Sequence, residues 1–117
     1  MRDKDLLARS GETAAARYLT GGGLTILARN WQCRAGEIDI VARRGRTLVI
    51  CEVKTRTGTR YGHPAECVTA SKLTRLRRLA AAWLAEHGGG YAQIRIDILA
   101  LTATETGFAV DHLQGVG

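Results

Sequence analysis

The apolar residues of this chain recur with two different periods, which divides it into helices and strands. Apolar residues three or four positions apart predict two amphipathic helices, over Asp3–Thr20 and Ser71–His87. Shorter stretches rich in Ile, Val and Leu predict five strands, which are Leu24–Trp31, Glu37–Ala42, Thr47–Lys54, Gln93–Leu101 and Gly107–Leu113.

The order of these elements predicts the fold class. It is α-β-β-β-α-β-β over residues 1–117, with no linker that would separate two domains. Arg43–Arg46 contains Gly45 and predicts a hairpin turn, and Thr55–Thr69 predicts a loop. A helix between the third and fourth strands allows the fourth to return parallel to the third. We therefore expect a single α/β domain, a mixed sheet flanked by helices.

The predicted hairpin brings two carboxylates onto one face. If its loop has two residues, Asp39 and Glu52 lie directly opposite each other; with four residues they lie on a diagonal. Lys54 follows on the same face. The pair would suit a hard divalent cation such as Mg²⁺, beside which Lys54 would orient a water or neutralise a phosphate. The alternative is an exposed face with an Asp39–Lys54 or Glu52–Lys54 ion pair.

Other polar residues extend this picture. Glu12 falls on the apolar side of the first helix, where a carboxylate needs a partner or a place at the rim of a cleft. Glu37 shares the face of Asp39, either as a further ligand or, more simply, next to Arg34 or Lys54. We expect Asp97 to pair with an arginine. Trp31 and Trp83 are expected in the core.

Charge adds a class of partner. The chain carries +6 at pH 7, and Arg43–Arg78 alone has ten basic and two acidic residues, net +8. Such a segment suits a polyanion, nucleic acid before an anionic membrane, although a merely solubilising surface is the simple alternative. The candidate phosphate contacts are Arg43, Arg44, Arg46, Arg56, Arg60, Lys72, Arg75 and Arg78, the last three on the outer face of the second helix.

Several classes of protein are excluded or disfavoured. No apolar run approaches the roughly 20 residues of a membrane span, and the N-terminus lacks the apolar segment of a secretory signal. The chain has three cysteines without a CxxC pair, so we expect a reducing, cytoplasmic location. His63, Cys67 and Cys51 match no usual zinc spacing.

Several blocks of the sequence, in order, carry a resemblance to a known family. They are GETAAARYL (11–19), ILARNWQCRAGEIDIVA (26–42), VICEVKTR (49–56), YGHPAECV (61–68) and RIDILAL (95–101). The aspartate and the E-x-K element resemble the core of the PD-(D/E)xK nuclease superfamily, although Ile38 replaces the proline before Asp39. The whole resembles the YraN-like family of small bacterial proteins, whose members are similar to archaeal Holliday-junction resolvases.

The resemblance implies a restriction-endonuclease-like fold and a set of roles. Glu12, Asp39 and Glu52 would be the metal carboxylates, with Mg²⁺ or Mn²⁺ as cofactor, and Lys54 the catalytic lysine. The implied activity is hydrolysis of DNA phosphodiesters, with branched DNA among the substrates and a homodimer suited to cutting two strands. Two other hypotheses stay open: a nucleic-acid-binding module without turnover, and a protein-interaction domain on a nuclease fold.

Overall fold

Two helices and five strands make up most of the computed structural model, which describes residues 3–58 and 62–117. The elements are α1 (Asp3–Gly21), β1 (Thr25–Cys33), β2 (Gly36–Arg44), β3 (Thr47–Arg56), the 3-10 turn η1 (Pro64–Cys67), α2 (Ala70–His87), β4 (Gln93–Thr104) and β5 (Gly107–Leu113). The expected order and the α/β class are confirmed. Only η1, a single turn inside the expected loop, was not predicted.

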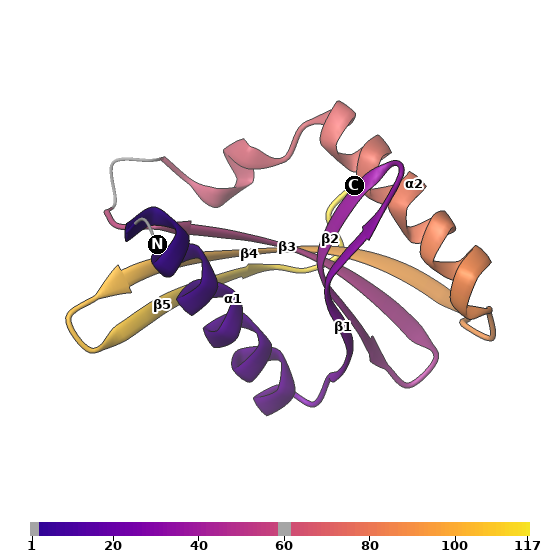
Figure 1. Ribbon diagram of the computed structural model, residues 1–117, viewed down its shortest axis with the longest axis horizontal. Coiled ribbons are helices and arrows are strands. Elements are labelled where there is room, and N and C mark those ends of the chain that lie inside the picture. The colour runs from indigo at the N-terminus through magenta and orange to yellow at the C-terminus, as the bar shows by residue number, and fades with distance from the viewer. Residues whose placement is uncertain (1–2, 59–61) are drawn as a thin grey trace.

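All five strands form one mixed sheet in the order β1-β2-β3-β4-β5 (Figure 1). Every neighbouring pair is antiparallel except β3 and β4, which run parallel because α2 lies between them in the chain. The β2–β3 turn has two residues, Gly45 and Arg46, since Arg44 pairs with Thr47. Gly45 has φ 59°, a left-handed conformation that glycine adopts without strain. The two-residue register expected for Asp39 and Glu52 is thus the one observed.

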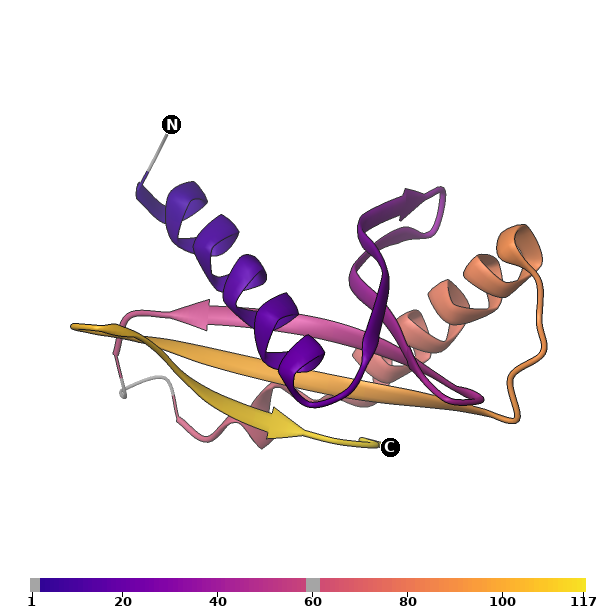
Figure 2. The same cartoon turned by 90° about the horizontal axis from the view of Figure 1, so that it is seen from below.

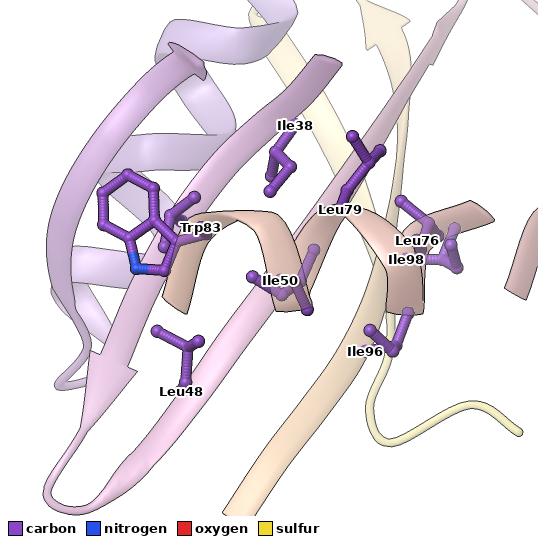
Figure 3. Packing of buried hydrophobic residues seen from close by; sticks show 10 residues of the cluster. Ile38, Leu48, Ile50, Leu76, Leu79, Trp83, Ile96 and Ile98 are labelled. Atoms are coloured by element: carbon purple, nitrogen blue, oxygen red, sulfur yellow. The ribbon is translucent and has the colours of Figure 1, made fainter. Parts of the chain in front are cut away.

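The helices cover opposite faces of the sheet. Leu76, Leu79 and Trp83 of α2 pack on Ile50 and its neighbours (Figure 3). Ala15 and Leu19 of α1 pack on the other face, which is formed mainly by Ile40, Ala42, Val49, Cys51, Leu99 and Leu101. Alternate residues of β3 therefore enter different cores. The sheet is buried on both sides along its centre.

Both tryptophans lie at the α2 core, as expected. Trp83 is 5% exposed, and half-buried Trp31 meets it edge to face with ring centroids 5.5 Å apart. Neither indole is available for base stacking without disturbing this packing. Within the part of the chain that is described, no helix is long and apolar enough to cross a membrane.

One expectation about β2 is wrong. Alternation along a strand puts Glu37 and Asp39 on one face, and it predicts that Ile38, Ile40 and Ala42 share the opposite face. In the structure Ile38 packs in the α2 core, whereas Ile40 and Ala42 pack in the α1 core. The reason is the path of the strand, because the tip of the β1–β2 hairpin rises out of the plane of the other strands, between the two helices (Figure 2). Asp39 lies between the two isoleucines, at the point where β2 changes its course.

Candidate functional site

Asp39 marks the end of pairing between β2 and β3. The last paired residues are Ile40 and Cys51, and Asp39 comes next on β2. The backbone N–H of Val53 donates to Asp39 Oδ2 at 2.8 Å. The carboxylate therefore accepts a hydrogen bond from a β3 amide beyond the last paired residues of β2 and β3. This bond holds the β1–β2 hairpin against β3 where the strand pairing ends.

Asp39 lies among other carboxylates. Burial, the largest influence, and the negative charges of Glu12, Glu52 and Glu37 together raise the pKa of Asp39 to about 6, against the hydrogen bond from Val53, which lowers it. These four acids come from α1, β2 and β3. The structure thus places Glu12, Glu52 and Glu37 within electrostatic reach of Asp39.

A glycine contact places Glu12 at this site. A Cβ added at Gly11 would collide with the side chain of Thr55, so α1 approaches β3 this closely only because residue 11 is glycine. Glu12, the next residue, is half-buried.

Asn30 links α1 to the hairpin. With its amide oriented to satisfy both neighbours, Nδ2 donates to Glu12 Oε1 at 3.2 Å and to Glu37 Oε1 at 3.1 Å. The residue has φ 52°, a left-handed conformation that asparagine tolerates better than most residues. Glu37 therefore contacts Asn30, and it forms no ion pair with Arg34 or Lys54. The amide bridges two carboxylates that would otherwise repel each other.

Glu52 is held by two cations from α2. Arg75 Nη2 donates to Glu52 Oε1 at 2.7 Å, and Lys72 Nζ lies 3.1 Å from Glu52 Oε2. Oε2 is shielded from solvent and has no hydrogen bond. The expectation that Lys72 is exposed on the outer face is wrong, because Lys72 continues the buried stripe of α2 toward its first turn. Only 19% of the Lys72 side chain is exposed. Arg75 is 48% exposed, as expected, yet its guanidinium reaches Glu52.

Lys54 is exposed and unengaged. Neither cross-strand ion pair that would have explained these charges without a ligand, Asp39–Lys54 or Glu52–Lys54, forms; across residues 3–58 and 62–117, Lys54 makes no salt bridge or side-chain hydrogen bond. Its ammonium is free to meet an anion in solution.

The carboxylates at this site are the type of ligand that a hard divalent cation prefers, but they are not arranged to coordinate one. As they stand, no three His, Cys, Asp or Glu side chains of the described residues are grouped closely enough to hold a metal ion. The donors are nevertheless carboxylate oxygens, which Mg²⁺ and Mn²⁺ prefer, and Glu52 Oε2 is a buried oxygen held by the ammonium of Lys72 at 3.1 Å. Glu12, Asp39 and Glu52 would hold the ion, with Lys72 and Arg75 released from Glu52.

The predicted basic segment does not form one continuous surface. Arg43, Arg44 and Arg46 surround the β2–β3 turn, roughly 20 Å along β3 from Lys54. Arg56 donates to Thr102 Oγ1 at 3.2 Å and to the Gly62 carbonyl at 3.0 Å. Arg60 lies outside the described residues. The folded chain therefore separates charges that the sequence places together.

One basic surface does lie near the site. Arg78 is exposed on α2, and with Arg75 it lines a shallow depression completed by Ser71, Thr74 and Ala35 of the hairpin tip.

A second buried carboxylate, Asp97, lies apart from these acids on β4. It is fully buried and receives a bidentate pair of bonds from Arg95, both at 2.9 Å, which confirms the expected arginine partner. The Gly115 amide donates at 3.0 Å, and His112 Nε2 lies 2.7 Å away. Every acceptor of Asp97 is satisfied, so its role is structural.

Cys51 and His63, two of the residues considered for zinc, have other surroundings in the structure. Cys51 is buried in the α1 core, where burial raises the pKa of its thiol. His63 Nδ1 accepts from the Ala65 amide at 3.1 Å and so caps η1.

Comparison with known proteins identifies the family. Residues 11–101 match the group described as "Uncharacterised protein family UPF0102", and the chain belongs to this family, the YraN-like family of the resemblance. A UPF0102 protein of Beutenbergia cavernae is 53% identical over 100% of both chains. Those of Frankia casuarinae and Streptomyces coelicolor are 53% and 50% identical, over 98% and 99% of this chain and 98% and 92% of theirs.

Among solved structures, Pyrococcus furiosus SfsA in complex with Ca²⁺ is similar with a TM-score of 0.43 and 13% identity. That likeness covers 98% of this chain and 64% of the other, so this chain spans less than two thirds of that protein.

Sequence reasoning missed two features of the site. Asn30 gave a weak signal, as a polar residue with turn propensity inside a predicted strand. The contacts of Lys72 and Arg75 gave a better one: Lys72 occurs four residues before Leu76, and Arg75 occurs four residues before Leu79, a spacing that puts each near the sheet-facing side of α2.

Proposed function

We propose that this protein is a metal-dependent endonuclease with a restriction-endonuclease-like fold that hydrolyses DNA phosphodiesters, branched DNA among them. Glu12, Asp39 and Glu52 form its cation site and Lys54 is its catalytic lysine. Membership of the UPF0102 family is compatible with this activity without specifying it. The proposal therefore depends on the chemistry of the site.

The observation that carries the proposal is the accumulation of acids around Asp39. Burial together with Glu12, Glu52 and Glu37 raises the pKa of Asp39 to about 6, so the folded chain sustains an electrostatic cost at neutral pH. Asp97 shows that the same chain satisfies a buried carboxylate completely elsewhere. Repelling, incompletely paired carboxylates are typical of cation and catalytic sites.

Each residue has a role in this reaction. When bound, Mg²⁺ or Mn²⁺ would polarise the scissile phosphate and lower the pKa of a water. Lys54, exposed and unpaired, neutralises charge that develops on the phosphate oxygens. Asp39 keeps a fixed orientation through Val53, and its burial among other acids favours binding of a cation that neutralises them.

The test is cleavage of four-way junction, flapped and duplex DNA in Mg²⁺ and in Mn²⁺. We expect Asp39→Ala and Lys54→Ala each to lower the rate by roughly 100-fold or more, because each removes a charge that acts on the transition state. Arg17→Ala, on the exposed side of α1, is the matched control that removes a positive charge outside the site. Cleavage that survives Asp39→Ala would contradict the proposal.

One observation favours a second candidate, a nucleic-acid-binding module without turnover. In the free chain Glu52 is already neutralised by Lys72 and Arg75, so the charges of β3 and α2 are balanced without a metal. Such a module would bind DNA equally well with EDTA and with Mg²⁺, and Asp39→Ala would leave its affinity unchanged. Metal-independent binding to all DNA forms, with no cleavage of any, would favour this candidate.

A further inference from the structure

The first turns of α2 supply two positive charges that contact Glu52, a carboxylate of the proposed cation site. Glu52 is buried, with only 11% of its side chain exposed, and a buried carboxylate needs a compensating positive charge. In the free chain that charge comes from Lys72 and Arg75. Together they carry the same charge as one divalent cation.

The fold fixes both side chains at this place. Thr69 caps α2 by accepting from the Lys72 amide at 3.2 Å, which sets where the helix begins. Leu76 and Leu79 bury the following turns against the sheet, so the same face presents Lys72 and Arg75 to Glu52.

Arg75 also faces a second possible partner. Its side chain is 48% exposed and lines the depression shared with Arg78, Ser71 and Thr74. A phosphate group in this depression would meet two guanidinium groups and the Ser71 hydroxyl, a set of donors suited to an oxyanion. Arg75 therefore lies between a carboxylate on one side and a surface suited to phosphate on the other.

We propose that Lys72 and Arg75 are displaceable counter-ions of Glu52: they hold the carboxylate in the free protein and move to the DNA backbone when DNA binds. Glu52 is then free to ligate a divalent cation, so the cation binds more tightly when DNA is present. The inference rests on the proposed cation site. It assigns to α2 the coupling between substrate binding and completion of that site, and it makes DNA and metal bind cooperatively.

The first test is the affinity of the DNA-free protein for Mn²⁺, measured by electron paramagnetic resonance. We expect Arg75→Gln to bind Mn²⁺ about tenfold more tightly than the wild type, because it removes a charged hydrogen bond that competes with the ion. Arg75→Lys restores the charge and should return the affinity toward the wild-type value. Arg78→Gln, one turn along and without contact to Glu52, is the matched control and should leave it unchanged.

The second test removes metal altogether. In EDTA, binding of a short duplex is measured against salt concentration, and Arg75→Gln should reduce the slope of log K by roughly 0.9, the value for one lost phosphate contact.

In a Glu52→Gln background the effect of Arg75→Gln on Mn²⁺ affinity should disappear, because the competing carboxylate is gone. Thermal melts of all variants show that each is folded.

Three results would overturn the inference. Weaker Mn²⁺ binding by Arg75→Gln would mean that Arg75 only positions Glu52 for the ion. An unchanged salt slope would mean that Arg75 does not reach DNA. A folded wild type that binds no Mn²⁺ would remove Glu52 from metal binding. Neither readout needs turnover, so a failure to cleave DNA would contradict the proposed function and leave this coupling intact.

Discussion

Two groups of buried acids in this small protein are treated in opposite ways. Asp97 on β4 is fully buried, yet Arg95, His112 and the Gly115 amide occupy its oxygens. Asp39 on β2 is less buried and has one backbone donor, while the acids near it raise its pKa to about 6. The chain can therefore satisfy a buried carboxylate, and around Asp39 it does not.

The difference follows from the surrounding strands. The Asp97 partners come from β4 itself and from β5 and the C-terminal segment, which lie flat against β4. Asp39 lies where the β1–β2 hairpin leaves the sheet between the two helices (Figure 2), so the acids of α1 and β3 meet it without a matching set of donors. The first group stabilises the fold, and the second forms the cation site that we propose.

The largest effect on stability is expected at Asp97. Asp97→Ala should lower the free energy of unfolding by about 3 to 5 kcal/mol, because it leaves Arg95 without its buried partner. Chemical denaturation at neutral pH measures this loss. Asp111→Ala, an exposed acid on β5, is the control and should change stability by no more than about 0.5 kcal/mol. A small loss at Asp97 would remove the contrast between the two groups.

Divalent cations should act on the other group. At a Mn²⁺ concentration about 100 times its dissociation constant, the wild type should gain about 2.7 kcal/mol of stability. The gain should be lost in Asp39→Asn and kept in Asp97→Asn, compared by denaturation in Mn²⁺ and in EDTA. Equal gains in both variants would mean that the ion binds elsewhere.

The pH dependence of Asp39→Asn should reveal its unfavourable charge. The pKa of Asp39 in the folded chain, about 6, lies above its usual value of 3.8. Between these two pH values the folded chain binds more protons than the unfolded chain, so its stability falls as the pH rises from about 4 to 6. In EDTA at pH 7 Asp39→Asn should therefore be more stable than the wild type, by about 1 to 2 kcal/mol after allowance for solvent screening.

The same comparison near pH 4 is its control. There Asp39 is protonated in the folded chain, and asparagine resembles it in shape and in accepting from Val53. The stability difference should nearly vanish. A difference that stays constant from pH 4 to pH 7 would show that it does not come from the charge of Asp39.

The smallest effect is expected at Asn30. Asn30→Gly keeps the left-handed backbone and removes the amide between Glu12 and Glu37, so it should cost about 0.5 to 1 kcal/mol. Asn30→Ala should cost more, because alanine also strains the backbone at φ 52°. If the two variants are equally stable, the conformation of residue 30 has no part in the effect.

Local patterns were sufficient to predict most of the fold. Apolar periodicity predicted both helices and all five strands, and the turn at Gly45 predicted the hairpin with a loop of either two or four residues, of which the structure has two. These features depend on residues close in sequence. The same patterns singled out Glu12 as an acid on the apolar side of its helix.

What sequence could not predict depends on long-range geometry. Ile38 and Ile40 pack in different cores because of the path of the whole hairpin. Alternation within one strand cannot predict that path. The net charge of Arg43–Arg78 suggested one basic surface, but most of the length of β3 separates the arginines of the turn from Lys54. The partners of Glu52 required the position of α2 over β3 to be known.

Anomalous diffraction of crystals grown with Mn²⁺ and a short DNA duplex would test the proposed cation site most directly. We predict a manganese peak among the carboxylates of Glu12, Asp39 and Glu52, with Lys72 and Arg75 turned from Glu52 to the DNA backbone. A complex in which both side chains still hold Glu52 and no manganese lies beside Asp39 would contradict it.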